Sequence, residues 1–253
     1  MIVWLVPLAG FAAFALNEIA NPRWAFLGKV HWKGDPGGVA LTFDDGPHPE
    51  HTPKVLEILD RFQAKASFFV IGRYLERHGS LVSAASRAGH LVANHSFHHF
   101  RAMSFFSSEE IRREIFQCQE ELGKWVGYRP RFYRQPAGFR NPKIFGILKE
   151  MGMSLVGWQT HALDTVAKDP RAIAQRVLKT VQPGGIILLH DGWDRDGKKD
   201  RTPTLEALPL ILQGLKDRGL EFFTLDRLLG MSKEEGPQGV RREAKNTGTR
   251  NNN

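Results

Sequence analysis

The sequence predicts an α/β domain with parallel strands, arranged as a barrel or as an open doubly wound sheet. Three observations support this fold class. A chain of 253 residues is long enough for one large domain with a substantial core. Short apolar runs alternate with longer amphipathic stretches, as expected for strands joined by helical crossovers. Polar residues also follow several of the predicted strands, where ligand sites of parallel α/β folds lie.

Each predicted strand is a short apolar run bounded by turn-forming or polar residues. The first run stops at Asp-Asp-Gly-Pro, residues that favour a turn. The later runs are equally brief, and their length favours strands over buried helices. The predicted strands are Gly38–Phe43, Ala66–Ile71, His90–Ala93, Phe132–Arg134, Ser154–Trp158, Gly185–Leu189 and Leu220–Thr224.

The stretches between these strands carry apolar residues at helical spacing. The best-marked helix start is Ser107, because Glu110 follows it three residues later and completes a capping box. The predicted helices are Thr52–Gln63, Leu75–Ala88, Ser108–Val126, Pro142–Met151, Arg171–Val181 and Thr204–Arg218. No repeat of the solenoid type interrupts this alternation.

Composition narrows the class of partners. The chain has 35 basic and 27 acidic residues, a net charge of +8, which favours anionic partners or serves only to keep the surface soluble. No nucleic-acid-binding motif accompanies the charge, so we expect no nucleic-acid partner. Cys118 is the only cysteine, which excludes an intrachain disulfide, and its helical setting predicts a small core residue.

The two ends differ from the middle of the chain. Residues 2–16 form an apolar run that is short for a membrane span, which needs ~20 residues, and suits a signal-peptide core. The basic residues follow this run instead of preceding it, so a signal, a membrane anchor and a buried N-terminal helix all remain open. We therefore expect an apolar segment at 1–20, one folded domain at 36–230 and a disordered polar tail at 231–253.

Charged residues and histidines follow five of the predicted strands. Because the carboxyl ends of parallel strands converge on one face, these side chains are expected at a single pocket. In strand order they are Asp44 with Asp45, His95 with His99, Arg134, Trp158 with Asp164, and His190 with Asp191.

These residue types fit metal-assisted amide hydrolysis. His95 and His99 stand four residues apart, a spacing that brings two imidazoles to one ion if the segment turns helically. With Asp45 they would form an open Asp-His-His site, and the ion would relieve the repulsion between Asp45 and Asp44. Asp44 would then act as the base, and His190 as an acid for the leaving amine.

Five ordered motifs, "TFDDGP", "HSFHH", "RQPAG", "WQTHALD" and "ILLHDG", resemble those of the polysaccharide deacetylase family, the NodB homology domain of carbohydrate esterase family 4. The resemblance runs from Gly38 to Leu228. It implies a single-domain, distorted (β/α) barrel of about seven parallel strands. It also implies a metal-dependent hydrolase that removes N-acetyl groups from N-acetylglucosamine-type polymers.

The resemblance assigns a role to each motif residue. It implies Asp44 as general base, His190 as general acid, Arg134 as the residue that orients the base, and Asp164 as the residue that tunes His190. It implies a divalent metal ion, zinc with cobalt or another ion as alternatives. The ligands would be Asp45, His95 and His99. The backbone N–H of Ala137 would face the oxyanion, and Leu188 would line the acetyl-methyl pocket.

Three positions depart from the family pattern. His161 and Thr165 replace an aspartate and a tryptophan of the fourth motif, and Ala137 stands where an aromatic residue is common. These changes bear on substrate identity more than on the reaction. Trp193 is a candidate for sugar stacking because it lies in a polar loop, whereas Trp158 is expected in the core.

The alternatives differ in substrate or in activity. The positive charge and the apolar residues 2–16 also suit a deacylase of a lipid-linked amino sugar at a membrane. A catalytically silent carbohydrate-binding module is a further alternative, although no expected catalytic residue is missing. We expect a membrane-associated or exported protein of the cell envelope, with the cytoplasmic face left open.

Overall fold

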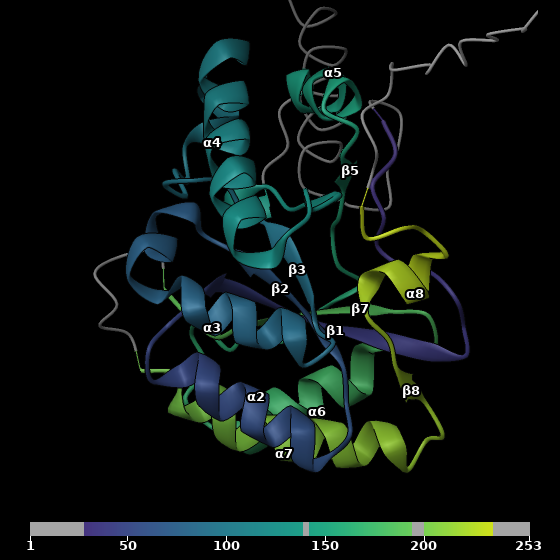
Figure 1. Cartoon of the computed structure of the whole chain (residues 1–253). Coiled ribbons are helices and arrows are strands. Elements are labelled where there is room, and N and C mark those ends of the chain that lie inside the picture. Colours follow the sequence, from purple (N-terminus) through teal and green to yellow (C-terminus); the bar gives the residue numbers. More distant parts are fainter. Residues whose placement is uncertain (1–27, 139–141, 194–199, 235–253) are drawn as a thin grey trace, which may run out of the picture.

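One parallel sheet organises the structure, a computed structural model that describes residues 28–138, 142–193 and 200–234. Its strand order is β5-β4-β3-β2-β1-β7-β6, and β8 pairs with the first residues of β1. The sheet curls into a half-barrel with helices on its outer face (Figure 1), so the predicted distorted (β/α) barrel is confirmed. The strands are β1 Gly38–Gly46, β2 Ala66–Val70, β3 Leu91–Asn94, β4 Phe132–Tyr133, β5 Ser154–Leu155, β6 Thr160–His161, β7 Ile186–His190 and β8 Glu221–Phe222.

The six predicted helices are all present, with bounds that differ from the prediction by at most two residues. The capping box is confirmed, because the Ser107 side chain accepts from the Glu110 N–H and the Glu110 carboxylate accepts from the Ser107 N–H at 2.8 Å. The α-helices are α2 His51–Arg61, α3 Leu75–Arg87, α4 Ser108–Val126, α5 Lys143–Glu150, α6 Pro170–Thr180, α7 Thr202–Lys216 and the unpredicted α8 Leu225–Leu229.

One strand prediction is wrong in an informative way. The run Ser154–Trp158 is not one strand, because β5 ends at Leu155 and the next strand, β6, begins at Thr160. These two strands lie at opposite ends of the sheet order. Between them the chain crosses the open seam of the half-barrel, where Gly157 N–H donates to the His31 carbonyl at 2.8 Å. Sequence periodicity cannot show that an apolar run changes partners midway.

The sheet separates two apolar layers. Along β1, Val39, Leu41 and Phe43 pack outward against the helices, in a cluster that includes Cys118 as predicted. Ala40 instead joins an inner cluster with Phe69 of β2, closed by side chains of α8. Because alternate strand residues share a face, Thr42 and Asp44 continue the inner row that begins at Ala40. The first carboxylate is therefore delivered to the inside of the half-barrel.

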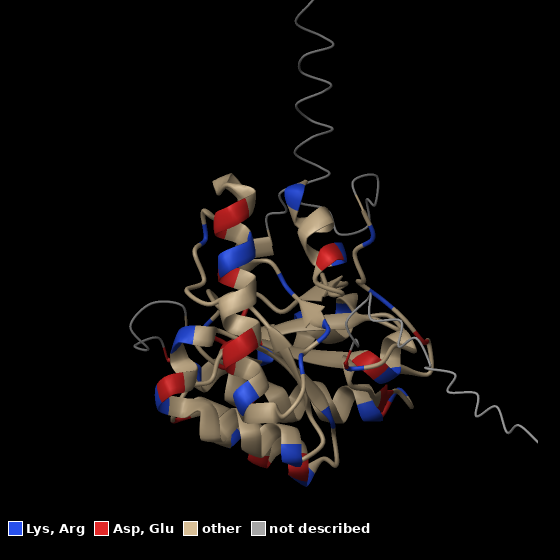
Figure 2. Ribbon diagram, turned by 45° about the horizontal axis from the view of Figure 1, so that its top comes forward, with Lys and Arg blue, Asp and Glu red and all other residues tan. Residues whose placement is uncertain are grey.

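Residues 2–16 lie outside the described residues, and so does the tail beyond residue 234. The first residues beyond 230 still contact the domain, since Glu234 forms an antiparallel bridge with Pro130. In the described part of the chain, no helix combines the length and the apolar character that crossing a bilayer requires. Lys and Arg are interspersed with Asp and Glu along the described helices (Figure 2).

Candidate active site

Both carboxylates of the Asp-Asp pair face the same pocket, although neighbouring residues of a strand normally point to opposite faces. The alternation is broken by a register shift between Asp44 and Gly46 and by the left-handed backbone of Asp45, with φ of 70°. Asp44 and Asp45 are only 3% and 5% exposed. Such backbone strain persists where the surrounding structure enforces it, commonly at functional sites.

The two histidines of the HxxxH pattern meet as predicted, but the segment between them is not helical. It is a loop in which Ser96 and His99 both adopt left-handed backbone conformations, with φ of 67° and 60°. The loop is held by side chains: Asn94 accepts from the Ser96 N–H at 2.9 Å, and Ser96 Oγ accepts from the His99 N–H at 3.1 Å. His98, expected to be a bystander, turns away and pairs with Glu114 at 2.7 Å.

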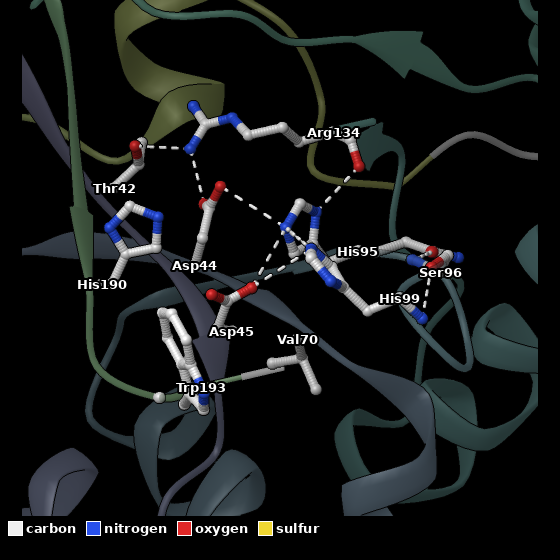
Figure 3. A network of polar contacts seen from close by, with 12 residues as sticks. Thr42, Asp44, Asp45, Val70, His95, Ser96, His99, Arg134, His190 and Trp193 are labelled. Atoms are coloured by element: carbon white, nitrogen blue, oxygen red, sulfur yellow. Dashed lines mark hydrogen bonds and ion pairs between the residues drawn. The ribbon is translucent and has the colours of Figure 1, made fainter. Parts of the chain in front are cut away.

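Three donor atoms converge at this place (Figure 3). His95 Nε2 lies 3.2 Å from His99 Nε2, and Asp45 Oδ1 lies 3.6 Å and 3.3 Å from the two nitrogens. Ligands held about 2.1 Å from a tetrahedral ion are themselves about 3.4 Å apart, so these spacings suit a zinc-sized cation. Among the described residues, Asp45, His95 and His99 form a cluster able to hold a metal ion.

The protonation state of His95 is also the one that a metal-binding imidazole needs. Its Nδ1 lies 2.8 Å from the backbone oxygen of Arg134, and because that oxygen only accepts, Nδ1 must carry a proton. Burial, aided by His99, lowers the pKa of His95 to about 3, so the ring is neutral and its Nε2 lone pair faces the cluster. A backbone partner of this kind orients a ligating imidazole.

Arg134 is buried on the inner face of the half-barrel, where its guanidinium binds Asp44 and neighbouring groups. Its guanidinium donates to Asp44 Oδ1 at 2.6 Å, to Thr42 Oγ1 at 2.8 Å and to the Gly157 carbonyl at 2.9 Å. It also lies 4.0 Å from the centre of the Phe69 ring and is 1% exposed. The other oxygen of Asp44 is 3.6 Å from His95 Nε2, so the carboxylate lies between Arg134 and the donor cluster. The orienting contact expected for Arg134 is present.

His190 and Asp164 form the second charged pair of the pocket. His190 Nδ1 lies 2.9 Å from Asp164 Oδ1, while Asp164 Oδ2 accepts from the His190 N–H at 2.8 Å and from Thr204 Oγ1 at 3.0 Å. Burial by itself would lower the pKa of His190, but the Asp164 charge outweighs it and raises that pKa above its usual value. A protonated imidazole is thereby favoured at the pocket wall, beside Asp44 in the sheet register.

Three more of the predicted residues line this pocket, whereas Asp191, also expected there, does not: it is buried and accepts a hydrogen bond from Thr52 Oγ1 at 2.5 Å. Ala137, Leu188 and Trp193 lie in its wall, as do the replaced positions His161 and Thr165. Ala137 has a left-handed φ of 56°, which fits a tight exposed turn. Burial, aided by His190, lowers the pKa of His161, and its Nδ1 accepts from the Leu163 N–H at 2.8 Å. A neutral imidazole thus stands where the family pattern has a carboxylate.

Sequence reasoning missed or misplaced some pocket residues. Trp158, expected in the core, does pack against the inner cluster, but it is only half-buried and also lines the pocket. Arg101, Gln135 and Val166 also line it. Arg101 stands two residues after His99, so the rule that sites gather at strand ends extends to it. Thr42 and Thr204 hold Arg134 and Asp164, and although Thr42 begins the TFDDGP motif, no sequence pattern gave either residue this role.

The fold and the charged pairs at its strand ends are those of a hydrolase of the α/β-barrel type. The chain belongs to the polysaccharide deacetylase family, whose sequence pattern matches residues 32–156. It is 37% identical over 199 residues to a peptidoglycan-N-acetylglucosamine deacetylase of Bacillus cereus, an alignment that covers 76% of this chain and 87% of that protein.

Two solved structures resemble this chain in fold. A crystal structure of the Bc1960 peptidoglycan N-acetylglucosamine deacetylase matches with a TM-score of 0.77 and 31% identity, over 81% of this chain and 95% of that one. A CE4 family pseudoenzyme from Bacillus anthracis matches with a TM-score of 0.71 and 26% identity, over 81% of this chain and 69% of that one. Because one of these two proteins is a pseudoenzyme, the shared fold alone does not establish activity.

Proposed function

We propose that this protein is a metal-dependent amide hydrolase that removes N-acetyl groups from the N-acetylglucosamine units of glycans such as peptidoglycan. The observation that carries the proposal is the spacing of Asp45, His95 and His99, which suits one divalent ion, directly beside the Asp44 carboxylate. The names of similar proteins support the substrate class. A silent carbohydrate-binding module would have no need of this arrangement.

Zinc is the proposed ion, because two imidazoles and one carboxylate with open positions are typical of catalytic zinc sites. Cobalt or another divalent ion is the alternative. When bound there, such an ion supplies a Lewis acid that polarises the acetamide and makes a water more acidic. Asp45, His95 and His99 would hold it, and the Arg134 carbonyl would keep His95 in the ligating tautomer.

The chain's own groups supply the proton transfers. Asp44, held by Arg134, is placed to take a proton from the attacking water. His190, kept protonated by Asp164, is placed to give a proton to the departing amine. The Ala137 N–H would face the developing oxyanion, and Leu188 would pack on the acetyl methyl group.

A glycan substrate such as peptidoglycan favours a location in the cell envelope. We propose that the domain at 36–230 works in the cell envelope and that residues 1–20 serve as an export signal or membrane anchor. The tail at 231–253 is proposed to be disordered. A lipid-linked amino sugar is retained as a second substrate class, for which residues 2–16 would supply the membrane contact.

The test combines metal analysis with acetate release from chitooligosaccharides, peptidoglycan fragments and lipid-linked amino sugars. Asp44→Asn should keep the metal and lose about 100-fold or more of kcat, because it removes a proton acceptor and spares the ligands. Asp60→Asn, the same substitution on an exposed helix position, is the matched control and should behave as wild type. Absence of acetate release from every substrate by metal-loaded protein would overturn the proposal, and glycan binding without turnover would favour the silent module.

A further inference from the structure

Asp191 is a buried acid that directly follows His190 in the chain, and the chemistry proposed above does not use it. It is 1% exposed and does not line the pocket. A buried carboxyl is unfavourable by itself, because it is removed from water. Its contacts therefore indicate what it holds in place.

The Asp191 side chain connects the end of β1 to the start of α2. Its Oδ2 accepts from Thr52 Oγ1 at 2.5 Å, and Thr52 Oγ1 in turn accepts from the His48 N–H at 2.8 Å. Both carboxyl oxygens also pack against Gly46, since a Cβ added to that glycine would lie 2.6 Å from each of them. The carboxyl is thus bonded to the second residue of α2 and packed against the last residue of β1.

The backbone at Asp191 and Gly192 packs against the two aspartates of β1. The Asp191 N–H donates to the Asp44 carbonyl at 3.2 Å. Gly192 lies so close to the following peptide that a Cβ added to it would be 2.0 Å from the Asp45 carbonyl oxygen. Gly192 is itself held, because its carbonyl accepts from Arg201 Nε at 2.8 Å. These contacts fix the backbone on which Asp45 is carried.

Asp45 is the metal-ligand candidate that most needs such support. Its φ of 70° lies in the left-handed region, which a residue other than glycine keeps only where its surroundings enforce it. If Asp45 relaxed to ordinary strand geometry, its side chain would point to the face opposite that of Asp44. Its Oδ1 would then leave the positions 3.6 Å from His95 Nε2 and 3.3 Å from His99 Nε2.

Resting on the proposed metal site, we propose that Asp191 is a positioning residue that holds Asp45 in the conformation that binds the ion. The carboxyl acts through its bond to Thr52 and its contact with Gly46, and the backbone acts through Asp44. Asp191 touches neither the substrate nor the ion in this role. Loss of such an outer partner of a ligand typically weakens metal binding about 10- to 100-fold.

The test measures Zn²⁺ and Co²⁺ binding to the metal-free protein, with Co²⁺ followed by the visible absorption of the bound ion. Asp191→Ala should weaken binding of both ions about 10- to 100-fold. It should also change the shape of the Co²⁺ spectrum, because the Asp45 ligand is displaced. Asp191→Asn should restore most of the affinity, since its amide oxygen has nearly the same place and can still accept from Thr52 Oγ1.

Thr52 supplies a matched pair of variants that leave Asp191 intact. Thr52→Val keeps the shape of the side chain and removes the hydroxyl, so it should weaken metal binding about 10-fold. Thr52→Ser keeps the hydroxyl and should bind the ions as wild type does.

Gly192→Ala tests the backbone contact. Its added Cβ would lie 2.0 Å from the Asp45 carbonyl oxygen, so Asp45 must move and metal binding should fall about 100-fold or more. Gly146→Ala is the matched control, because a Cβ on Gly146 in α5 meets no atom of the described chain within 4 Å beyond the backbone of its own helix. It should keep the wild-type affinity.

Val177→Ala separates positioning from a general loss of stability. Val177 is fully buried on α6, so its truncation should lower the urea midpoint by leaving a cavity. Its metal affinity and Co²⁺ spectrum should nevertheless match those of wild type, unlike those of Asp191→Ala.

The outcomes distinguish this proposal from the proposed function. If wild type binds metal and releases acetate, and Asp191→Ala, Thr52→Val and Gly192→Ala bind metal equally well, the positioning role is overturned and the proposed function stands. An equal loss of affinity in Val177→Ala would also overturn the positioning role, because lower stability would then explain every loss. A wild-type protein that binds no divalent ion would overturn the proposed function and the role of Asp191 with it.

Discussion

The buried pair formed by Arg134 and Asp44 gives the sharpest energetic prediction. Replacing Arg134 with Met keeps a long apolar stem over the Phe69 ring but removes the guanidinium, which lies 4.0 Å from that ring. Asp44, only 3% exposed, would lose its 2.6 Å ion pair, and Thr42 Oγ1 and the Gly157 carbonyl would lose a donor. Removing one partner of a buried pair costs about 3–5 kcal/mol, because the other charge stays uncompensated.

This cost is measurable by urea unfolding of the metal-free protein. With a denaturant slope of about 2 kcal/mol per molar urea, a loss of about 4 kcal/mol lowers the midpoint by about 2 M. Adding Asp44→Asn to Arg134→Met removes the orphaned charge and should restore about 2 kcal/mol, a coupling that only interacting groups show.

The control for this cycle is Arg227→Met, because Arg227 is 61% exposed at its side chain and its loss should change stability by less than about 0.5 kcal/mol. The reasoning is refuted if Arg134→Met costs under about 1 kcal/mol, or if the double variant is no more stable than Arg134→Met alone.

The other predictions concern the metal, the acid and the fold. His95→Ala should abolish stoichiometric metal binding and acetate release, whereas His98→Ala should keep both in the same assays, because His98 pairs with Glu114 outside the cluster. Asp164→Asn should lower the pKa of His190, since the effect of burial is then opposed only by the smaller contributions of Asp45 and Asp44. As the acid must be protonated, the fall of kcat with rising pH should begin at lower pH than in wild type, and an unchanged pH profile would contradict the assignment. Ser107→Ala should cost about 1 kcal/mol in thermal or urea unfolding by removing the capping box, with kcat unaffected.

The elements themselves were largely predictable from local sequence. Short apolar runs mark the strands, and apolar residues at helical spacing mark the helices between them. Both patterns reflect which side chains are buried, and they can be read from residues close together in the sequence. The capping box at Ser107 is similarly local, and it places the start of α4 correctly. The split of Ser154–Trp158 into β5 and β6 was not predictable, because it depends on the chain crossing the seam of the half-barrel.

The motifs and the positions at strand ends identify the site residues, but they do not predict how these residues are arranged in space. The spacing of His95 and His99 suggested a helical turn, and the structure instead brings them together through a loop with two left-handed residues. The pairing of His190 with Asp164 was anticipated, whereas the Thr204 hydroxyl that also bonds Asp164 was not. Long-range polar partners of this kind leave no periodic trace in the sequence.

Residue order and local pattern were enough to establish which chemical groups this protein possesses and the strand ends from which they project, because strand-end position follows from local pattern. That Asp44 and Asp45 share one pocket is a property of the folded chain, because the register shift and positive φ at Asp45 depend on how β1 pairs with its neighbours. The same holds for Arg101 and Trp193, whose contact joins two loops far apart in the chain. Folding sets such contacts through packing between distant segments, which residue order alone does not specify.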